Sequence, residues 1–210
     1  MFKDRIEAGS LLAAQLSAYK SDQGVVLAIP KGGVPLAYVV AKELGFSMEL
    51  VFTKKIGHPN NKEYAIGAAS LSDYFVIPHY DVSEEYIQDE LKVVRQKLQR
   101  MQDKFMADHK PENLNGKTVI IVDDGMATGN TVLSTISLIK KSKPAKIIVA
   151  VPVASRSAVQ LVSKEADEVI VLKTPPDFSG VGVYYENFND VSEQEVLLYL
   201  EKFRELKMLH

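Results

Sequence analysis

The sequence VIIVDDGMATGNT, residues 119–131, joins an apolar run to two adjacent aspartates and a loop of small residues. A run that is apolar at nearly every position is typical of a strand buried on both faces of a parallel sheet. Neighbouring side chains of a strand point to opposite faces, so Asp123 and Asp124 can share a ligand only where the chain leaves the strand. Gly125 and Gly129 permit that exit, because glycine adopts conformations that other residues avoid. We therefore expect a strand that ends in a ligand-binding loop.

The loop leads into a predicted helix, because the residues from Thr131 onward, TVLSTISLIKK, have helical apolar spacing. The free N–H groups and the dipole at a helix N-terminus attract anions, and Thr128 and Asn130 add side-chain donors. A phosphate monoester is the natural occupant, and the preceding carboxylates suit the hydroxyls of a sugar. Together they predict a site for a ribose 5-phosphate. The alternative is that the two aspartates are ordinary turn residues at a strand end.

Apolar runs rich in Val and Ile recur along the chain, with helical patterns between most of them. They cover Val25–Ile29, Glu49–Thr53, Thr118–Val122, Lys146–Val151 and Glu168–Leu172. This alternation predicts an α/β fold with a mostly parallel open sheet flanked by helices. Residues 54–78 change to turn residues followed by two short β-prone pieces, which predict a small antiparallel excursion that overhangs the site as a hood.

Two helical patterns lie outside this alternation. From Ser83 to about Lys110, apolar residues repeat with a period of 3.5, and this seam either packs along its own domain, which we favour, or forms a homodimer contact. SEQE at residues 192–195 has the pattern of a capping box and predicts a docked C-terminal helix. We see no linker and expect a single domain over residues 1–210, with hood elements around 55–80 and 173–192.

The composition excludes several classes of protein. Of 210 residues, 46% are apolar, which suits a substantial core, and 25 Lys and Arg against 27 Asp and Glu leave a formal charge of −2 without single-sign blocks. We therefore expect neither a nucleic-acid partner nor a membrane partner. The absence of cysteine excludes disulfides and thiolate nucleophiles. With neither a signal-peptide pattern nor an apolar run of roughly 18 residues, we expect a cytoplasmic protein.

A second loop resembles an anion site. AIPKGGVPLA, residues 28–37, ends a buried strand with Lys31, Gly32 and Gly33 before a helical pattern. Backbone amides and one cation suit a diphosphate, although a lone KGG is most often a surface turn. Its position before the aspartate motif favours the binding interpretation.

Other polar candidates follow two further strands. Lys54 and Lys55 are predicted to close the second strand and to face different sides, so at most one points into a site. Arg156 lies after AVPVAS at the carboxyl end of a strand, the edge where open α/β sheets bind ligands, or it solvates the next helix. Aromatic residues of the segment 173–192 either stack on a nucleobase or, as we favour, pack over the core edge. These residues are Phe178, Tyr184, Tyr185 and Phe188.

Together these motifs resemble those of type I phosphoribosyltransferases, with VIIVDDGMATGNT similar to the phosphoribosyl pyrophosphate signature. DRIEAG, PKGGVP, KKIGHP, AVPVAS and the Tyr-rich tail extend the resemblance over nearly the whole chain, to a bacterial subgroup whose acceptor is unassigned. The resemblance implies that Asp123 and Asp124 hold the ribose hydroxyls and that Ala127–Thr131 hold the 5-phosphate. It also implies that PKGGVP holds pyrophosphate, in a loop that often has a non-proline cis peptide in this family.

The implied reaction displaces pyrophosphate from Mg²⁺-bound phosphoribosyl pyrophosphate by a nitrogenous base, so the expected partners are small molecules. The aspartates would hold Mg²⁺ directly, through water or through the ribose hydroxyls. Ala127 replaces the Asp of members that salvage 6-oxopurines, which disfavours those acceptors. The expected catalytic residues are Asp123, Asp124, Lys54 and Lys55. The expected substrate-binding residues are Lys31, Gly32, Gly33, Asp123, Asp124, Gly125, Ala127, Thr128, Gly129, Asn130, Thr131 and Arg156.

Two alternatives stay open. The first is a sensor or regulator of the same fold that binds phosphoribosyl pyrophosphate or a nucleotide without turnover. The second is a receiver-like signalling domain, which also places acidic residues at strand ends. The ATGNT loop and the helical insertion at 83–110 count against the receiver-like domain.

Overall fold

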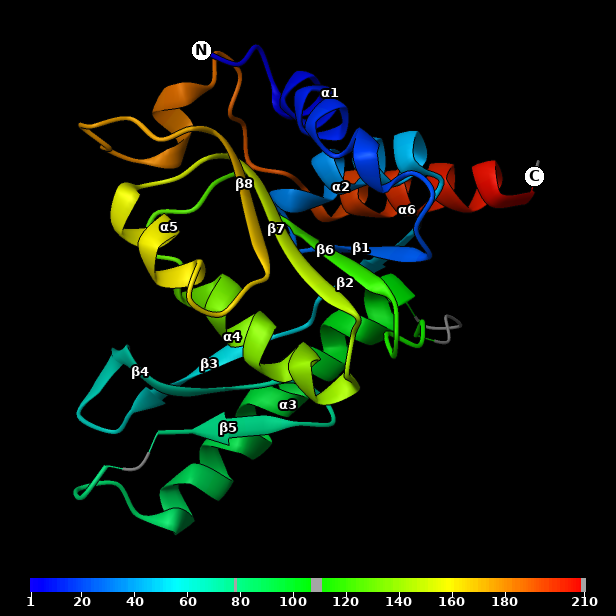
Figure 1. Ribbon diagram of the computed structural model, residues 1–210. Helices are drawn as coiled ribbons and strands as arrows, with labels where there is room; N and C mark the ends of the chain where they lie inside the picture. Colours follow the sequence, from blue (N-terminus) through cyan, green and yellow to red (C-terminus); the bar gives the residue numbers. More distant parts are fainter. Residues whose placement is uncertain (78, 107–110, 209–210) are drawn as a thin grey trace.

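The apolar run that precedes the aspartates forms β6 (Thr118–Val122), the central strand of a five-stranded parallel sheet. The computed structural model describes residues 1–77, 79–106 and 111–208. The strand order is β2-β1-β6-β7-β8, and all neighbouring strands are parallel (Figure 1). The other strands are β1 (Gly24–Ala28), β2 (Ser47–Leu50), β7 (Lys146–Val153) and β8 (Glu168–Lys173). The predicted parallel sheet is confirmed.

Helices cover both faces of this main sheet. The helices α1 (Arg5–Gln15), α2 (Gly33–Leu44) and α6 (Glu193–Met208) cover one face, and α4 (Asn130–Ile139) and α5 (Arg156–Val162) cover the other. Side chains of a strand alternate, so Val26 and Ala28 of β1 pack with the first group, while Val25 and Leu27 pack with the second. Burial on both faces explains why these strands are almost continuously apolar. Short 3₁₀ helices are η1 (Ser17–Tyr19), η2 (Lys140–Ser142) and η3 (Val181–Tyr184).

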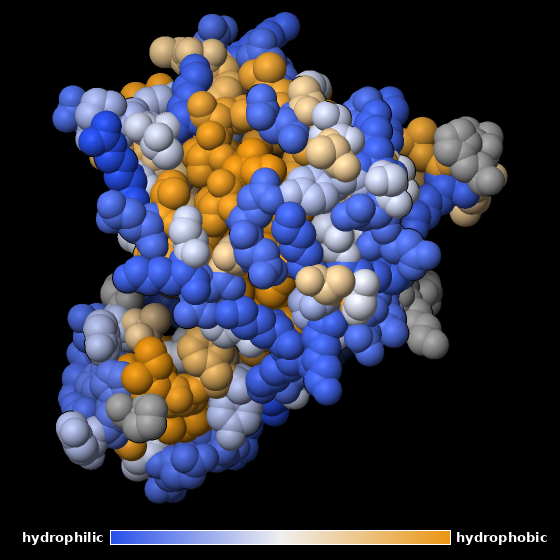
Figure 2. Space-filling view, viewed as in Figure 1, coloured by the Kyte–Doolittle hydropathy of each residue, from blue (hydrophilic) through white to orange (hydrophobic). Residues whose placement is uncertain are grey.

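A small antiparallel sheet follows β2 and confirms the predicted excursion. It has the order β3-β4-β5, formed by β3 (Lys54–His58), β4 (Asn61–Ala69) and β5 (Tyr74–Val76). The helix α3 (Glu84–Met106) packs along it (Figure 1). Figure 2 shows apolar side chains reaching the surface over both sheets, with a band of hydrophilic side chains between them. Beneath this surface, the small sheet and α3 share a buried apolar cluster of their own.

The structure corrects the second predicted strand. That strand lies at Ser47–Leu50 instead of Glu49–Thr53, because β2 pairs with β1 and β1 ends at Ala28, the partner of Leu50. Lys54 and Lys55 therefore begin β3 instead of closing β2. The predicted turn is present at residues 59–60, but residues 54–58 before it form a strand that pairs with β4, so the excursion has three strands instead of two.

The two helices predicted outside the βα alternation are present. The apolar seam of α3 packs on the small sheet, and its last residues join the core of the main sheet, which confirms packing along its own chain. The predicted end of this helix, residues 107–110, lies outside the described residues. A homodimer stays a prediction. The capping box before α6 is confirmed, because Ser192 N donates to Glu195 Oε2 at 2.8 Å and Glu195 N donates to Ser192 Oγ at 3.2 Å.

In the described ranges, 1–77, 79–106 and 111–208, no helix is both long enough and apolar enough to cross a membrane.

Candidate functional site

The candidate site lies where the order of the main sheet reverses. β1 is flanked by β2 on one side and by β6 on the other, so the chain changes direction across the sheet between β1 and β6. Open α/β sheets bind ligands in the crevice at the carboxyl ends of such strands. The loop after β1 contains Lys31, Gly32 and Gly33, and the loop after β6 contains both aspartates. Two motifs about ninety residues apart therefore meet at one edge.

The glycines of the first loop lie against the aspartate segment. A Cβ at Gly32 would fall 2.1 Å from Asp124 Oδ2, and a Cβ at Gly33 would fall 2.5 Å from the carbonyl oxygen of Val122. Only glycine fits at either position without a shift of the neighbouring chain. The Pro30–Lys31 peptide bond is cis, as in the related loops that the sequence resembles. Lys31 itself is exposed at this loop.

Asp124 has a cationic partner that the sequence reasoning missed. Arg5, the first residue of α1, donates from Nε and Nη2 to Asp124 Oδ2 at 3.0 and 2.9 Å. Only 11% of the Arg5 side chain and 15% of the Asp124 side chain are exposed. Arg5 Nη1 also donates to the carbonyl oxygen of Asn189 at 2.7 Å, and its guanidinium lies 4.0 Å from the centre of the Phe188 ring. The motif DRIEAG contains this arginine, but nothing in the motif indicates a partner so distant in the sequence.

The environment of the acid pair disfavours the ionised form of both carboxyl groups. Burial raises the pKa of Asp123 well above its usual value, and the charge of Asp124 raises it further. Burial also raises the pKa of Asp124, although the hydrogen bonds and charge of Arg5 oppose this shift. The hydroxyl of Tyr185 donates to the carbonyl oxygen of Asp124 at 2.6 Å, and burial raises the pKa of this phenol. Two buried carboxylates of raised pKa favour hydrogen-bond donors or a cation as a ligand.

The second loop ends at the N-terminus of α4, as predicted. Gly129 is at the N-cap with a φ of 79°, a left-handed conformation that favours glycine, and it has no side chain to cap the first amides. A Cβ at Gly125 would fall 2.4 Å from Val181 Cγ1, so the segment 173–192 closes tightly over the start of the loop. The side chains exposed around this helix end are Ala127, Thr128, Asn130 and Thr131. An anion can therefore reach the amides of the first turn.

Ser155 connects this loop to the end of β7. Its hydroxyl donates to the carbonyl oxygen of Ala127 at 2.6 Å and accepts from Ala158 N at 3.1 Å, which caps α5. Its own amide donates to the carbonyl oxygen of Met126 at 3.0 Å. The expected Arg156 is the exposed first residue of α5. A serine before a helical pattern is a capping signal, so the sequence could have indicated Ser155 alongside Arg156.

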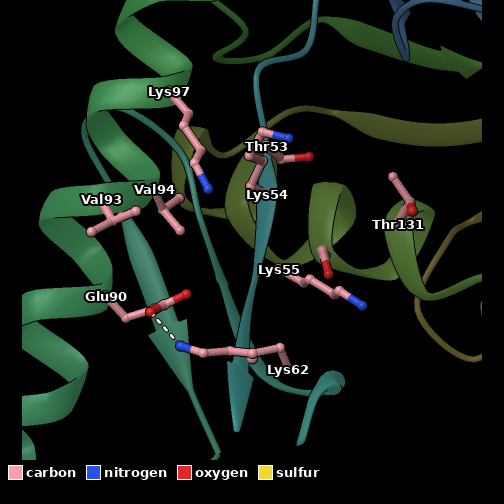
Figure 3. Close-up of a pocket in the computed structure, with 11 residues that line it drawn as sticks. Thr53, Lys54, Lys55, Lys62, Glu90, Val93, Val94, Lys97 and Thr131 are labelled. Atoms are coloured by element: carbon pink, nitrogen blue, oxygen red, sulfur yellow. Dashed lines mark hydrogen bonds and ion pairs between the residues drawn. The ribbon is translucent and has the colours of Figure 1, made fainter. Parts of the chain in front are cut away.

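Lys54 and Lys55 border a different cavity. It has a volume of about 640 Å³ and is lined by residues of β3, β4, α3 and α4. The two lysine side chains extend in different directions, as expected for strand neighbours, but both line this one pocket (Figure 3). That at most one of them points into a binding site stays a prediction. Of the residues expected to bind phosphate, Thr131 is shared with this pocket.

The aromatic residues of the segment 173–192 pack on the core, which confirms the interpretation we favoured. Tyr185 is 5% exposed and belongs to the core of the main sheet. Phe178, Tyr184 and Phe188 are partly buried against the same core. The segment thus forms a wall over the aspartates and Gly125.

Asp123 and Asp124 are the carboxylates that would contribute to holding a magnesium ion at this site. Within the described ranges, no group of three or more His, Asp or Glu side chains gathers around one point. The aspartate pair would therefore supply one or two carboxylates, and substrate oxygens and water would complete the coordination. Mg²⁺ is commonly bound in this manner beside phosphates.

The fold and the site define an α/β protein that can bind a phosphorylated sugar at the switch point of a parallel sheet. The chain matches the phosphoribosyl transferase domain over residues 4–187, and it therefore belongs to that family. Its sequence is 32% identical over 209 residues to a Mycobacterium tuberculosis protein named "Putative phosphoribosyl transferase". That alignment covers 96% of this chain and 47% of the relative, so the chain spans about half the length of the relative.

Two further comparisons describe the family context. The crystal structure of the protein TT1426 from Thermus thermophilus superposes with a TM-score of 0.89 at 34% identity, over 97% of this chain and 99% of that one. The uracil phosphoribosyltransferase of Mycoplasma genitalium is 44% identical over 54 residues, or 26% of either chain. The agreement with the Thermus protein covers the main sheet and the small sheet together.

Proposed function

We propose that this protein is a phosphoribosyltransferase that uses Mg²⁺-bound phosphoribosyl pyrophosphate and transfers the phosphoribosyl group to a nitrogenous base. One observation carries the proposal: the backbone of Gly32 lies against the carboxylate of Asp124. This contact unites the diphosphate-type loop, the acid pair and the phosphate-type loop in one crevice. Their order matches the diphosphate, the ribose and the 5-phosphate of the donor.

Each part of the crevice takes one part of the donor. The free amides of residues 127–131 bind the 5-phosphate at the N-terminus of α4. Asp123 and Asp124 accept hydrogen bonds from the vicinal ribose hydroxyls. These donors stabilise the ionised form of both side chains, which burial disfavours. Lys31 and the amides of Gly32 and Gly33 bind the leaving diphosphate. Mg²⁺, when bound, neutralises diphosphate charge.

In the reaction, the bond between the anomeric carbon and the diphosphate oxygen breaks and a bond to the nitrogen of the acceptor forms. Pyrophosphate leaves with the electron pair, and the acceptor nitrogen loses its proton to the departing pyrophosphate or to water. Catalysis comes from the positioning of the donor and from stabilisation of the charge on the ribose and diphosphate. Lys54 and Lys55 line the cavity that also includes Thr131 of the phosphate loop, and they remain the predicted catalytic lysines.

The acceptor is expected not to be a 6-oxopurine. Ala127 has no carboxylate to exchange a proton with a purine, and its carbonyl oxygen is already bound by Ser155. The relative from Mycoplasma genitalium is named for uracil, so pyrimidines belong in any acceptor panel.

Isothermal calorimetry with phosphoribosyl pyrophosphate and Mg²⁺ tests the donor site. We expect saturable binding by the native protein and no detectable binding by the double variant Asp123→Asn/Asp124→Asn. Equal affinities would exclude the proposed ribose site. Pyrophosphate release over a panel of purines, pyrimidines and orotate then tests turnover. If phosphoribosyl pyrophosphate bound but no acceptor caused release of pyrophosphate, the result would favour a non-catalytic sensor over a phosphoribosyltransferase.

A further inference from the structure

Tyr185, in the segment 173–192, holds the main chain of Asp124. Its hydroxyl donates to the carbonyl oxygen of Asp124 at 2.6 Å. The Tyr185 ring contacts the rings of Phe2 and Phe188, with centroids 5.4 and 5.0 Å away, and the residue is 5% exposed. Burial raises the pKa of the phenol, so the hydroxyl keeps its proton and acts as the donor. The packing of the ring therefore fixes the direction of this hydrogen bond.

The backbone around Tyr185 is anchored by the segment before α1. Phe2 and Tyr185 form a parallel bridge between the two segments. Phe2 N donates to the carbonyl oxygen of Tyr184 at 2.8 Å, and Glu186 N donates to the carbonyl oxygen of Phe2 at 2.8 Å. Because these bonds lie on both sides of Tyr185 in the sequence, they hold its backbone in place beside Asp124.

The hydrogen bond from Tyr185 sets the plane of the next peptide unit. The bond between Asp124 and Gly125 is trans, since the cis bond of the described residues is Pro30–Lys31. In a planar trans peptide, the carbonyl oxygen and the following N–H point in opposite directions. The N–H of Gly125 therefore points away from Tyr185, and it has no hydrogen-bond partner in the part of the chain that the structure describes. It is a free donor directly beside the two carboxylates.

We propose that Tyr185 is a positioning residue for the ribose of the donor, through its hold on the peptide between Asp124 and Gly125. With that peptide fixed, the carboxylate of Asp124 accepts from a ribose hydroxyl, and the amide of Gly125 donates to an oxygen of the ribose 5-phosphate group. Arg5 holds the side chain of the same aspartate at Oδ2, so Arg5 and Tyr185 fix different parts of Asp124. Tyr185 acts through the main chain and does not contact the donor. This role rests on the proposed function, and the Lys31 loop, which takes the diphosphate, is independent of it.

Calorimetry with three ligands, each with Mg²⁺, tests this role: phosphoribosyl pyrophosphate, ribose 5-phosphate and pyrophosphate. Tyr185→Phe keeps the ring and removes the hydroxyl alone. We expect its affinity for the two ligands that contain ribose to fall about three- to tenfold, as for the loss of one neutral hydrogen bond. Its affinity for pyrophosphate should equal that of the native protein, because pyrophosphate binds at the Lys31 loop. A general loss of structure would instead weaken the binding of all three ligands.

Tyr184→Phe is the matched control. The hydroxyl of Tyr184 donates to the carbonyl oxygen of Asp177 at 3.1 Å in an exposed hydrogen bond, so all three affinities should stay unchanged. If the native protein bound neither ligand that contains ribose, the proposed function would fail and the positioning role with it. If the native protein bound both and Tyr185→Phe bound them equally well, the positioning role alone would be overturned. An equal loss of pyrophosphate affinity would also overturn it, since Tyr185 would then support the fold as a whole.

Discussion

Arg5 and Asp124 are 119 positions apart in the chain, yet they form a two-point ion pair at the candidate ribose site. Arg5 lies at the start of α1, where the preceding Asp4 caps the helix by accepting from the amides of Ile6 and Glu7. The cap fixes the first turn of α1, and the cation–π contact with Phe188 holds the guanidinium in place. Arg5 is therefore a positioning residue whose hydrogen bonds and charge oppose the rise in the pKa of Asp124 that burial causes.

Removing Arg5 should make stability more dependent on pH. Arg5 lowers the pKa that Asp124 would otherwise have, so the stabilisation by Arg5 is present when Asp124 is ionised and is lost as pH falls through the pKa of Asp124. For Arg5→Gln we expect the free energy of unfolding to drop by about 2 to 3 kcal/mol at pH 8 and by much less at pH 4. Urea denaturation at pH 8 and at pH 4 measures this loss of unfolding free energy. Arg100→Gln, at an exposed position, is the control. An equal loss at both pH values would contradict the argument.

The contact of Gly32 with Asp124 predicts that Gly32→Ala impairs binding of the donor. The added methyl group would overlap a carboxylate oxygen at 2.1 Å, so the carboxylate or the loop must move. We expect affinity for phosphoribosyl pyrophosphate to fall at least about tenfold in calorimetry, since a displacement of this size breaks hydrogen bonds.

Gly116→Ala is the control for that substitution. Gly116 has a φ of 70° and no atom within 4 Å of a built Cβ, so its replacement tests backbone strain alone. We expect about 1 kcal/mol of lost stability and unchanged donor affinity. If both variants bound the donor normally, the close approach at Gly32 would have no functional role.

Among the secondary-structure elements, the N-termini of α4 and α5 hold the loop of the candidate site in place. α4 begins with Gly129 in a left-handed conformation, and α5 begins with a side-chain cap from Ser155. The same hydroxyl holds the carbonyl oxygen of Ala127, so the cap of one helix also fixes the loop before the other. The N-termini of α4 and α5 are thereby held together by one buried serine.

Ser155→Ala should weaken both elements together. The loss of an N-cap costs about 1 to 2 kcal/mol, and the carbonyl oxygen of Ala127 also loses its donor. We expect this loss in urea denaturation, with weaker binding of phosphoribosyl pyrophosphate in calorimetry. Ser163→Ala at the other end of α5 is exposed and should change neither quantity. Lower stability with unchanged affinity would separate the helix cap from the phosphate loop.

Across the whole molecule, the two sheets have separate buried clusters. Ile56, Ile66 and the seam of α3 form the cluster of the small sheet, and partly buried Phe52 packs against both this cluster and one cluster of the main sheet. Figure 2 shows the hydrophilic band between the two parts on one face of the molecule. Elements with few shared apolar contacts open locally at a lower free energy than the global core.

Ile66→Ala tests this division of the molecule. Ile66 is fully buried in the small sheet, so truncation should cost about 2 to 4 kcal/mol. We expect amide hydrogen exchange to accelerate in β3, β4, β5 and the first half of α3, while β6 keeps its protection. Ile120→Ala in β6 is the matched control and should accelerate exchange in the main sheet, while the small sheet still exchanges through its own local opening. Uniform acceleration by Ile66→Ala would show that both sheets open as one unit.

The sequence by itself determined the main sheet, its flanking helices, the antiparallel excursion, the capping box of α6 and the burial of the α3 seam. These depend on periodicity and on local signals, which a chain carries wherever it folds. The prediction of strand boundaries was wrong where the pairing of strands sets the boundary. β2 ends where its partner β1 ends, at Ala28, so Lys54 and Lys55 belong to the next strand, β3.

The tertiary structure alone decided which distant residues touch. Arg5 beside Asp124, Gly32 beneath the same carboxylate, Ser155 on the phosphate loop and the lysines around the cavity are all contacts between separate elements. No local pattern encodes such contacts, because they depend on the order of the strands and on the faces that the helices cover. The motif after β6 predicts the chemistry of the candidate site, and the packing of the chain supplies the electrostatic partner of Asp124.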